Sequence, residues 1–214
     1  MSAYRNFVED FSVRCGEVLE RTKNWKNRDV TILFMAASAG FVVPFERIGS
    51  TRGSNNSSHP SRDGEKFEKK TKELDDLMEK SFLGSCLHRA TETEWTYSEL
   101  DRFDGNIDNF PEIFRKNITN NKKVTRILKI LRNALAHGNL YTFPSTIGHP
   151  IARMIFISYK VHNDPTKGFY SLSVPPEKFR DFLKQWFEFL KNVESLKIME
   201  PWEKLKKHLG QEAA

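Results

Sequence analysis

The segment before Gly138 constrains the fold most, because its apolar residues recur at the spacing of an amphipathic helix. When each residue is advanced by roughly 100° around a helix axis, six apolar residues fall on one broad side: Val124, Ile127, Leu128, Leu131, Ala134 and Leu135. A side of this kind packs inward. We expect the helix to begin near Thr119 or Asn120 and to end at His137, with Gly138 as the left-handed residue that commonly follows a helix.

Polar residues of the same segment gather in a second band. The band spans roughly 80° around the axis, and its members are Lys122, Arg126, Lys129, Asn133 and His137. We expect its cations to follow a phosphate backbone. Arg132 lies outside the band, at the edge of the apolar side. One helix alone therefore does not direct Arg132 and His137 to one atom, unless two copies pack with their helix ends adjacent or the last turn loosens at Gly138.

Three side chains at this helix end suit phosphate chemistry. Arg132 offers a planar, permanently charged fork for phosphate oxygens, and Asn133 offers a neutral hydrogen-bonding amide. His137 carries the one side chain that ordinarily titrates near neutral pH. These groups suffice to cleave RNA without a metal ion. Because the sequence has no Gly-rich phosphate loop, paired-carboxylate motif or metal-ligand spacing, we expect neither a metal nor a cofactor.

The octet Leu-Arg-Asn-Ala-Leu-Ala-His-Gly at 131–138 resembles the signature of the HEPN superfamily, in which Arg and a polar residue precede His. Here the spacing is Arg-x4-His. Three other segments follow the order of a plasmid- and phage-defence-associated HEPN subfamily: Arg-Asp-Val-Thr-Ile-Leu at 28–33, Val-Pro-Phe-Glu at 43–46, and 172–190, which starts with Leu-Ser-Val. The resemblance implies a mainly α-helical bundle that forms a single domain over 1–214. It also implies a homodimer in which two copies of the motif share one cleft.

The function that the resemblance implies is a metal-independent endoribonuclease, acting in phage defence or as a toxin. His137 would be the general base for a ribose 2′-hydroxyl or the acid for the leaving oxygen. Arg132 would stabilise charge on the phosphoryl oxygens, and Asn133 would orient the imidazole or bind the phosphate. The cations expected to bind RNA are Lys122, Arg126 and Lys129. A toxin would in addition have an antitoxin or another protein partner.

Two other interpretations remain open. A HEPN-type module without catalytic activity would bind RNA, a nucleotide or a partner protein, and a helical assembly protein would use the apolar segment 30–41 for oligomerisation. The motif also has a structural explanation, since a His before a capping Gly is favourable at the negative end of a helix. Glu46 matches the family pattern, and a structural salt bridge explains it as well as chemistry does.

Apolar residues at helical spacing predict further helices, at 2–22, 30–41, 65–80 and 81–90. Pro44 is expected to end or kink the second of these. Residues 49–64 are rich in turn formers and are expected to be a mobile loop. Two β-branched and aromatic runs, 154–159 and 169–174, flank turn formers and predict a small β-hairpin. A helix follows from Pro176.

Charge, cysteine content and apolar stretches limit the cellular compartment and the partners that the sequence supports. The formal charge of +6 at pH 7 permits, but does not demonstrate, attraction to a polyanion. Cys15 and Cys86 show no metal spacing and no disulfide framework, which favours a reducing cytoplasm. Because Gly40 and Pro44 interrupt the longest apolar stretch and no apolar leader is visible, we expect neither secretion nor membrane spanning. Residues 204–214 are expected to be a basic tail.

Overall fold

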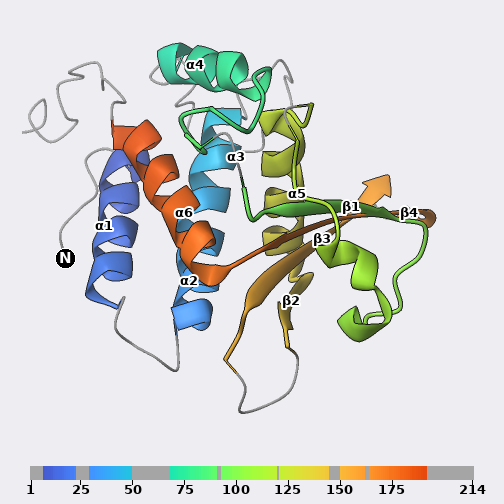
Figure 1. Ribbon diagram of the computed structural model, residues 1–214. Helices are drawn as coiled ribbons and strands as arrows, with labels where there is room; N and C mark the ends of the chain where they lie inside the picture. Colours follow the sequence, from blue (N-terminus) through green and yellow to red (C-terminus); the bar gives the residue numbers. More distant parts are fainter. Residues whose placement is uncertain are drawn as a thin grey trace, which may run out of the picture.

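The computed structural model describes residues 7–22, 29–49, 68–90, 93–119, 121–144, 150–161 and 164–191. Among them, helices occupy one side of the molecule and an antiparallel sheet of four strands occupies the other (Figure 1). The helices are α1 (Phe7–Arg21), α2 (Asp29–Ala37), α3 (Val43–Gly49), α4 (Glu68–Met78), α5 (Val124–His137) and α6 (Pro176–Lys191). The fold is mixed α/β. The expectation of a mainly α-helical bundle with only a small hairpin at 154–174 is therefore wrong.

The sheet is built around the predicted hairpin. Its strands are β1 (Thr96–Leu100), β2 (Leu140–Phe143), β3 (Arg153–Val161) and β4 (Asp164–Val174), in the order β1-β4-β3-β2. Within the hairpin, Met154 pairs with Val174 and Tyr159 pairs with Phe169, which confirms the pairing of the two runs. The strands β1 and β2, which the sequence patterns did not predict, add an edge on each side. The hairpin is therefore the centre of a sheet, and most residues of β3 and of the second half of β4 are buried.

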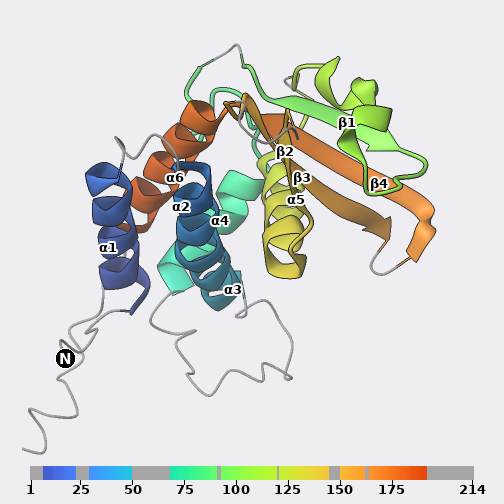
Figure 2. The same ribbon diagram turned by 90° about the horizontal axis from the view of Figure 1, so that it is seen from below.

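Both faces of the sheet are covered. On β3, Met154 and Phe156 belong to the core shared with the helices, whereas Ile155 and Ile157 belong to a second core. This alternation is the ordinary consequence of a strand whose side chains point to opposite faces in turn. Residues 103–114 contribute to the second core and lie on the side of the sheet away from α5 (Figure 2). They contain two short 3-10 helices, Ile107–Asn109 and Pro111–Phe114.

The helical path of the chain continues past the end that was expected near Phe41, although α2 itself ends at Ala37. A π turn (Ser38–Val42) joins α2 to α3, and the chain stays helical to the end of α3. Pro44 has no amide hydrogen, so the carbonyl of Gly40 lacks the hydrogen bond that a residue four positions later normally donates. Nε1 of Trp186, in α6, donates to this carbonyl at 3.1 Å. Pro44 therefore opens a contact between helices and does not end the helix.

α5 has the inward side that the periodicity predicts. Its six predicted apolar residues are each at most 6% exposed. The helix ends at His137 as predicted, and Gly138 adopts the left-handed conformation with φ of 71°. The amide of Gly138 donates to the carbonyl of Ala134, which satisfies one of the carbonyls that a helix end leaves unpaired.

The start of α5 is later than predicted, because the residues before Val124 pair with the chain that follows α4. The amide of Phe82 donates to the carbonyl of Lys122 at 2.8 Å, and the amide of Val124 donates to the carbonyl of Lys80 at 2.9 Å. The same pairing accounts for the segment 81–90, which was expected to be a helix. It consists of turns and short bridges instead.

Two predicted segments fall outside the residues that the structure describes. They are the loop at 49–64, of which only Gly49 is described, and the basic tail at 204–214. In the described part of the chain, no helix is both long enough and apolar enough to cross a membrane.

Candidate functional site

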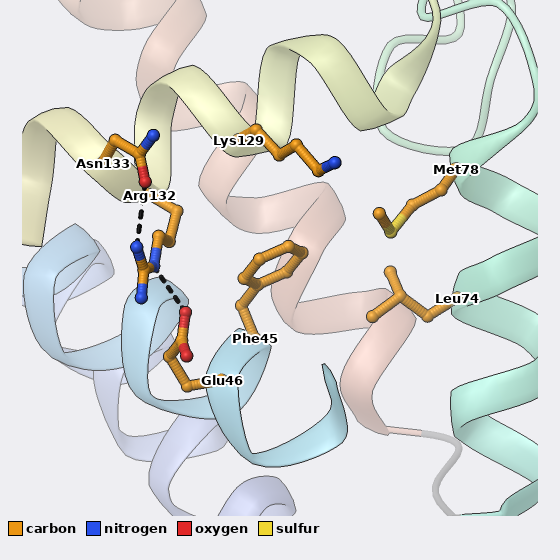
Figure 3. A pocket seen from close by; sticks show the side chains of 7 residues that line it. All are labelled: Phe45, Glu46, Leu74, Met78, Lys129, Arg132 and Asn133. Atoms are coloured by element: carbon orange, nitrogen blue, oxygen red, sulfur yellow. Dashed lines mark hydrogen bonds and ion pairs between the residues drawn. The ribbon is translucent and has the colours of Figure 1, made fainter. Parts of the chain in front are cut away.

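Two acceptors hold the guanidinium of Arg132. Its Nε donates to Oε1 of Glu46 at 2.5 Å, and its Nη1 donates to Oδ1 of Asn133 at 2.9 Å (Figure 3). The side chains of Arg132 and Glu46 are 34% and 43% exposed. An ion pair this exposed contributes only about 0–1 kcal/mol to stability. Its main effect is therefore to orient the guanidinium, and the salt bridge that the sequence left open for Glu46 is present.

Asn133 is fixed through both atoms of its amide. While Oδ1 accepts from Arg132, Nδ2 donates to the hydroxyl of Ser158 on β3 at 3.2 Å. The Ser158 hydroxyl is buried and donates in turn to the carbonyl of Tyr159 at 3.3 Å. A chain of hydrogen bonds thus ties the guanidinium to β3, one of the two central strands of the sheet. In this arrangement Asn133 positions Arg132.

A pocket of about 290 Å³ opens between α3, α4 and α5, beside this guanidinium (Figure 3). Its lining consists of Phe45, Glu46, Leu74, Met78, Lys129, Arg132 and Asn133. Arg132 uses Nε and Nη1 for its two acceptors. Its Nη2 has no hydrogen-bond acceptor among the described residues, so its hydrogens are available to an anion in the pocket.

His137 lies apart from this pocket. It is exposed in the last turn of α5, five residues after Arg132, and it is not among the residues that line the pocket. This placement agrees with the helical geometry, which turns the two side chains in different directions. Within one copy of the chain, the structure does not bring the two principal motif residues into one pocket.

The predicted RNA-binding cations separate into two groups. Lys129 lines the pocket, whereas Nζ of Lys122 lies 4.0 Å from the ring centre of Tyr97, and Cζ of Arg126 lies 4.4 Å from that of Tyr170. The two tyrosine rings stack on each other, with ring centres 6.1 Å apart. Cations over aromatic faces are attracted by the ring quadrupole. Of the three cations, Lys129 is therefore the one placed beside the motif arginine.

A carboxylate partly neutralises the patch of Lys122 and Arg126. The hydroxyl of Tyr97 donates to Oε1 of Glu99 at 2.8 Å, and Nζ of Lys160 lies 3.7 Å from Oε2 of Glu99. Burial, and then the bond to Glu99, raise the pKa of Tyr97. The hydrogen bond from Tyr97, together with the nearby lysines, lowers the pKa of Glu99. Glu99 therefore stays ionised and offsets part of the positive charge.

Sequence reasoning missed Ser158 and did not single out the ring of Phe45. Ser158 interrupts the apolar run of β3, and a lone polar residue inside a buried strand indicates a hydrogen-bond partner on a neighbouring element. That signal was visible in the sequence. The position of Phe45 beside Lys129 was not, because it depends on how α3 leaves the π turn.

No group of three or more His, Cys, Asp or Glu side chains that could hold a metal ion occurs within the described ranges. The acidic segment at 101–108 instead makes local hydrogen bonds. The carboxylate of Asp104 accepts from the amide of Asn106 at 2.8 Å and from Nδ2 of Asn109 at 2.8 Å.

Comparison with protein-family models matches residues 1–197 to the family described as HEPN pEK499 p136. No curated protein and no solved structure matches the chain significantly. The family match covers α1 to α6 and includes the whole motif helix.

Proposed function

Because the chain belongs to the HEPN pEK499 p136 family, we propose that it is a metal-independent endoribonuclease with Arg132 and His137 as its catalytic groups. The observation that carries the proposal is the guanidinium of Arg132, which Glu46 and Asn133 hold beside an open pocket. A donor that is fixed before the substrate arrives stabilises developing charge without a cost of reorganisation.

The nucleophile in this reaction belongs to the substrate. His137 takes the proton of a ribose 2′-hydroxyl, whose oxygen bonds to phosphorus while the bond to the 5′ oxygen breaks. A second imidazole, in its protonated form, gives a proton to that leaving oxygen. The products are a 2′,3′-cyclic phosphate and a 5′-hydroxyl, and the step balances without a redox partner. DNA lacks the 2′-hydroxyl and is not a substrate.

Arg132 stabilises the negative charge on the phosphoryl oxygens. Its Nη2 hydrogens bind a non-bridging oxygen, while Nε and Nη1 remain on Glu46 and Asn133. Hydrogen bonds from a guanidinium to phosphate are charge-assisted and roughly twice as strong as neutral ones. Asn133 acts on the reaction through Arg132, by keeping the guanidinium turned toward the pocket.

A homodimer supplies the second imidazole. Since His137 does not line the pocket of its own copy, two helix ends must lie together for both residue types to meet one phosphate. Exposed apolar side chains on the helical segment that leads to Glu46 support such a surface: Met35 is 67% exposed in α2, and Val43 is 37% exposed in α3. The biological role that the HEPN resemblance implies is defence against phage or toxicity held in check by an antitoxin.

A non-catalytic HEPN-type binding module is the second candidate. The observation in its favour is that the carboxylate of Glu46 already occupies Nε of Arg132, so an incoming anion receives only part of the guanidinium. A module of this kind binds RNA, a nucleotide or a protein with the same affinity whether or not the imidazole of His137 is present. Substitution of His137 therefore distinguishes the two candidates.

The test is to incubate wild-type, His137→Ala and Arg132→Ala protein with labelled single-stranded and structured RNA in EDTA. We expect the wild type alone to cut, and to leave 2′,3′-cyclic phosphate ends. Arg89→Ala, which removes an exposed arginine far along the chain from the motif, is the control and should cut normally. Unchanged cleavage by a folded His137→Ala variant would refute the catalytic role of His137. Equal RNA binding by wild-type and His137→Ala protein, with no cleavage by either, would favour the binding module.

A further inference from the structure

The pocket beside Arg132 is lined by both apolar and charged side chains. Phe45, Leu74 and Met78 form an apolar wall. The charged groups of the lining are Lys129, Arg132 and Glu46, with the ammonium of Lys129 turned toward Met78 and the guanidinium of Arg132 bonded to Glu46 (Figure 3). A phosphate alone would make no favourable contact with the apolar wall, and an aliphatic ligand would make none with the two cations. The lining therefore suits a ligand that joins an anionic group to a flat apolar one.

The ring of Phe45 is held in a fixed orientation. It stacks on Phe41 with ring centres 5.6 Å apart and an angle of 27° between the planes, and it lies 6.3 Å from the ring of Trp186. Both of these partners are fully buried. Because the core immobilises the ring, a ligand that packs against it meets a surface that needs no further ordering.

The opposite wall comes from α4. Leu74 and Met78 are buried in the main core, yet both reach the pocket. α4 is anchored by Lys70, whose buried ammonium donates to the carbonyl of Phe189 at 2.9 Å. The two apolar walls thus stand on helices that the core holds in place, and the volume of about 290 Å³ between them is small for a ligand site. It is suited to one planar ring system.

The cations lie at the edge of the apolar wall. The ammonium of Lys129 is exposed and has no ion pair with any residue that the structure describes, and Nη2 of Arg132 also lacks an acceptor there. Lys129 and Arg132 are neighbours at i and i+3 on one helix, so the Lys129 side chain would turn toward Arg132 when both donate to one phosphate. Because Glu46 already pairs with Arg132, the charge of such a phosphate would be balanced mainly by Lys129. The base attached to that nucleotide would then lie beside Phe45.

We infer that this pocket binds one nucleotide of a single-stranded RNA, with its base against Phe45, Leu74 and Met78 and its phosphate between Lys129 and Arg132. The inference rests on the proposed function, which makes RNA the ligand. It adds the site at which one base of the RNA strand is bound. Bases of unpaired RNA are commonly recognised by stacking on aromatic side chains.

The experiment measures binding without cleavage. Wild-type protein is titrated with 2′-O-methyl oligonucleotides, which lack the reactive hydroxyl, and a single abasic residue is moved along the strand. We expect one position at which loss of the base weakens binding by about tenfold, the size that one stacked base contributes. A profile that is flat along the strand would overturn the inference.

A second arm uses mononucleotides and inorganic phosphate. Phe45→Leu should weaken the binding of nucleoside monophosphates by about tenfold and leave that of phosphate unchanged, whereas Lys129→Ala should weaken both. Phe103→Leu alters a ring of the second core and is the matched control. Equal effects of Phe45→Leu on both ligands would contradict a base site. Mononucleotide binding combined with a flat abasic profile would also refute the placement of an RNA residue here.

The two proposals fail separately. If wild-type protein cuts no RNA but shows the abasic position, the ribonuclease is refuted and the base pocket stands. If it cuts RNA and the profile is flat, the base pocket is refuted and the ribonuclease stands.

Discussion

The carboxylate of Glu46 accepts a hydrogen bond from Nε of Arg132, although 86 positions separate the two residues in the sequence. The bond links α3, which follows a π turn, to the last turns of the motif helix α5. The orientation of the motif arginine therefore depends on a helix encoded far upstream.

Glu46→Ala should lower the rate of RNA cleavage by about 10- to 100-fold, because a misplaced catalytic group is costly. The melting temperature should change little, since the pair is half exposed. Glu79→Ala is the matched control, because it removes an exposed partner of Lys123 and does not line the pocket. Cleavage rates and thermal unfolding are measured for both variants. Activity that falls only in proportion to lost folded protein would show that Glu46 has a structural role alone.

Ser158→Ala should act on cleavage through Asn133. Without the hydroxyl, Nδ2 of Asn133 loses its acceptor on β3 and the amide no longer holds Arg132 as firmly. Single and double substitutions at the two positions form a thermodynamic cycle, and residues in one network show coupling of about 0.5–3 kcal/mol. We expect Ser158→Ala to have little further effect once Asn133 is replaced by Ala. Strictly additive effects on the rate would contradict the positioning chain.

Gly40→Ala should destabilise the fold by about 1–3 kcal/mol, the usual cost of overpacking. A methyl group there would stand 2.8 Å from the ring of Phe187 and 3.0 Å from Cβ of Cys15. Gly16→Ala is the control, because its methyl group would lie 3.6 Å from the same ring, at ordinary contact distance. Gly16 is inside α1, where Ala is favoured over Gly by roughly 0.5–1 kcal/mol. Urea denaturation should place the two variants on opposite sides of the wild type.

Cys15 should make the fold sensitive to alkaline pH. Burial raises the pKa of its thiol from 9.0 to about 11, so the folded state favours the neutral form. The stabilisation is complete below pH 9, where both states are protonated. It declines between about pH 9 and 11, as the unfolded thiol ionises and the folded one does not. Cys15→Ala should flatten this decline in a series of denaturation curves. At pH 8, thiol reagents should label Cys86, which is exposed, well before Cys15.

Lys129→Ala should reduce the salt dependence of RNA binding. If Lys129 neutralises one phosphate of a single strand, the slope of log affinity against log salt should become shallower by about 0.7. Lys123→Ala is the control, since its ammonium pairs with Glu79 at 2.7 Å. Both slopes are obtained from titrations between low and moderate salt. An unchanged slope for Lys129→Ala would remove this residue from the RNA contact.

Helices were predictable from the sequence where apolar residues recur at helical spacing. α5 and α6 show a helical repeat of apolar residues, and the end of α5 at Gly138 follows from local backbone preference. The strand β1 was not predictable, because its residues Thr96–Leu100 do not alternate between polar and apolar. Four of these five residues are buried, since the sheet is covered on both faces. Periodicity carries no signal in such a strand.

The motif residues of the candidate site stand out in the sequence, but the way their side chains are arranged was not predictable. The octet identifies Arg132, Asn133 and His137 by type, and helical geometry correctly separates Arg132 from His137 in direction. The partners that orient Arg132 come from α3 and from β3, through Glu46 and Ser158. Contacts between distant segments of this kind depend on tertiary packing, which the local sequence does not encode.

The direct passage from α5 into β2 restricts how His137 can move. Only Gly138 and Asn139 separate its helix from the strand, and the carbonyl of Asn139 accepts from the amide of Ile157 at 3.1 Å. The last turn of a helix ordinarily frays, because its carbonyls have no hydrogen-bond partners within the helix. Here hydrogen bonds to the sheet hold the chain immediately after His137, so fraying of the last turn requires β2 to detach from β3. The amides around His137 should therefore exchange with solvent as slowly as those of the sheet, and motion of the imidazole is confined to its own side-chain torsions.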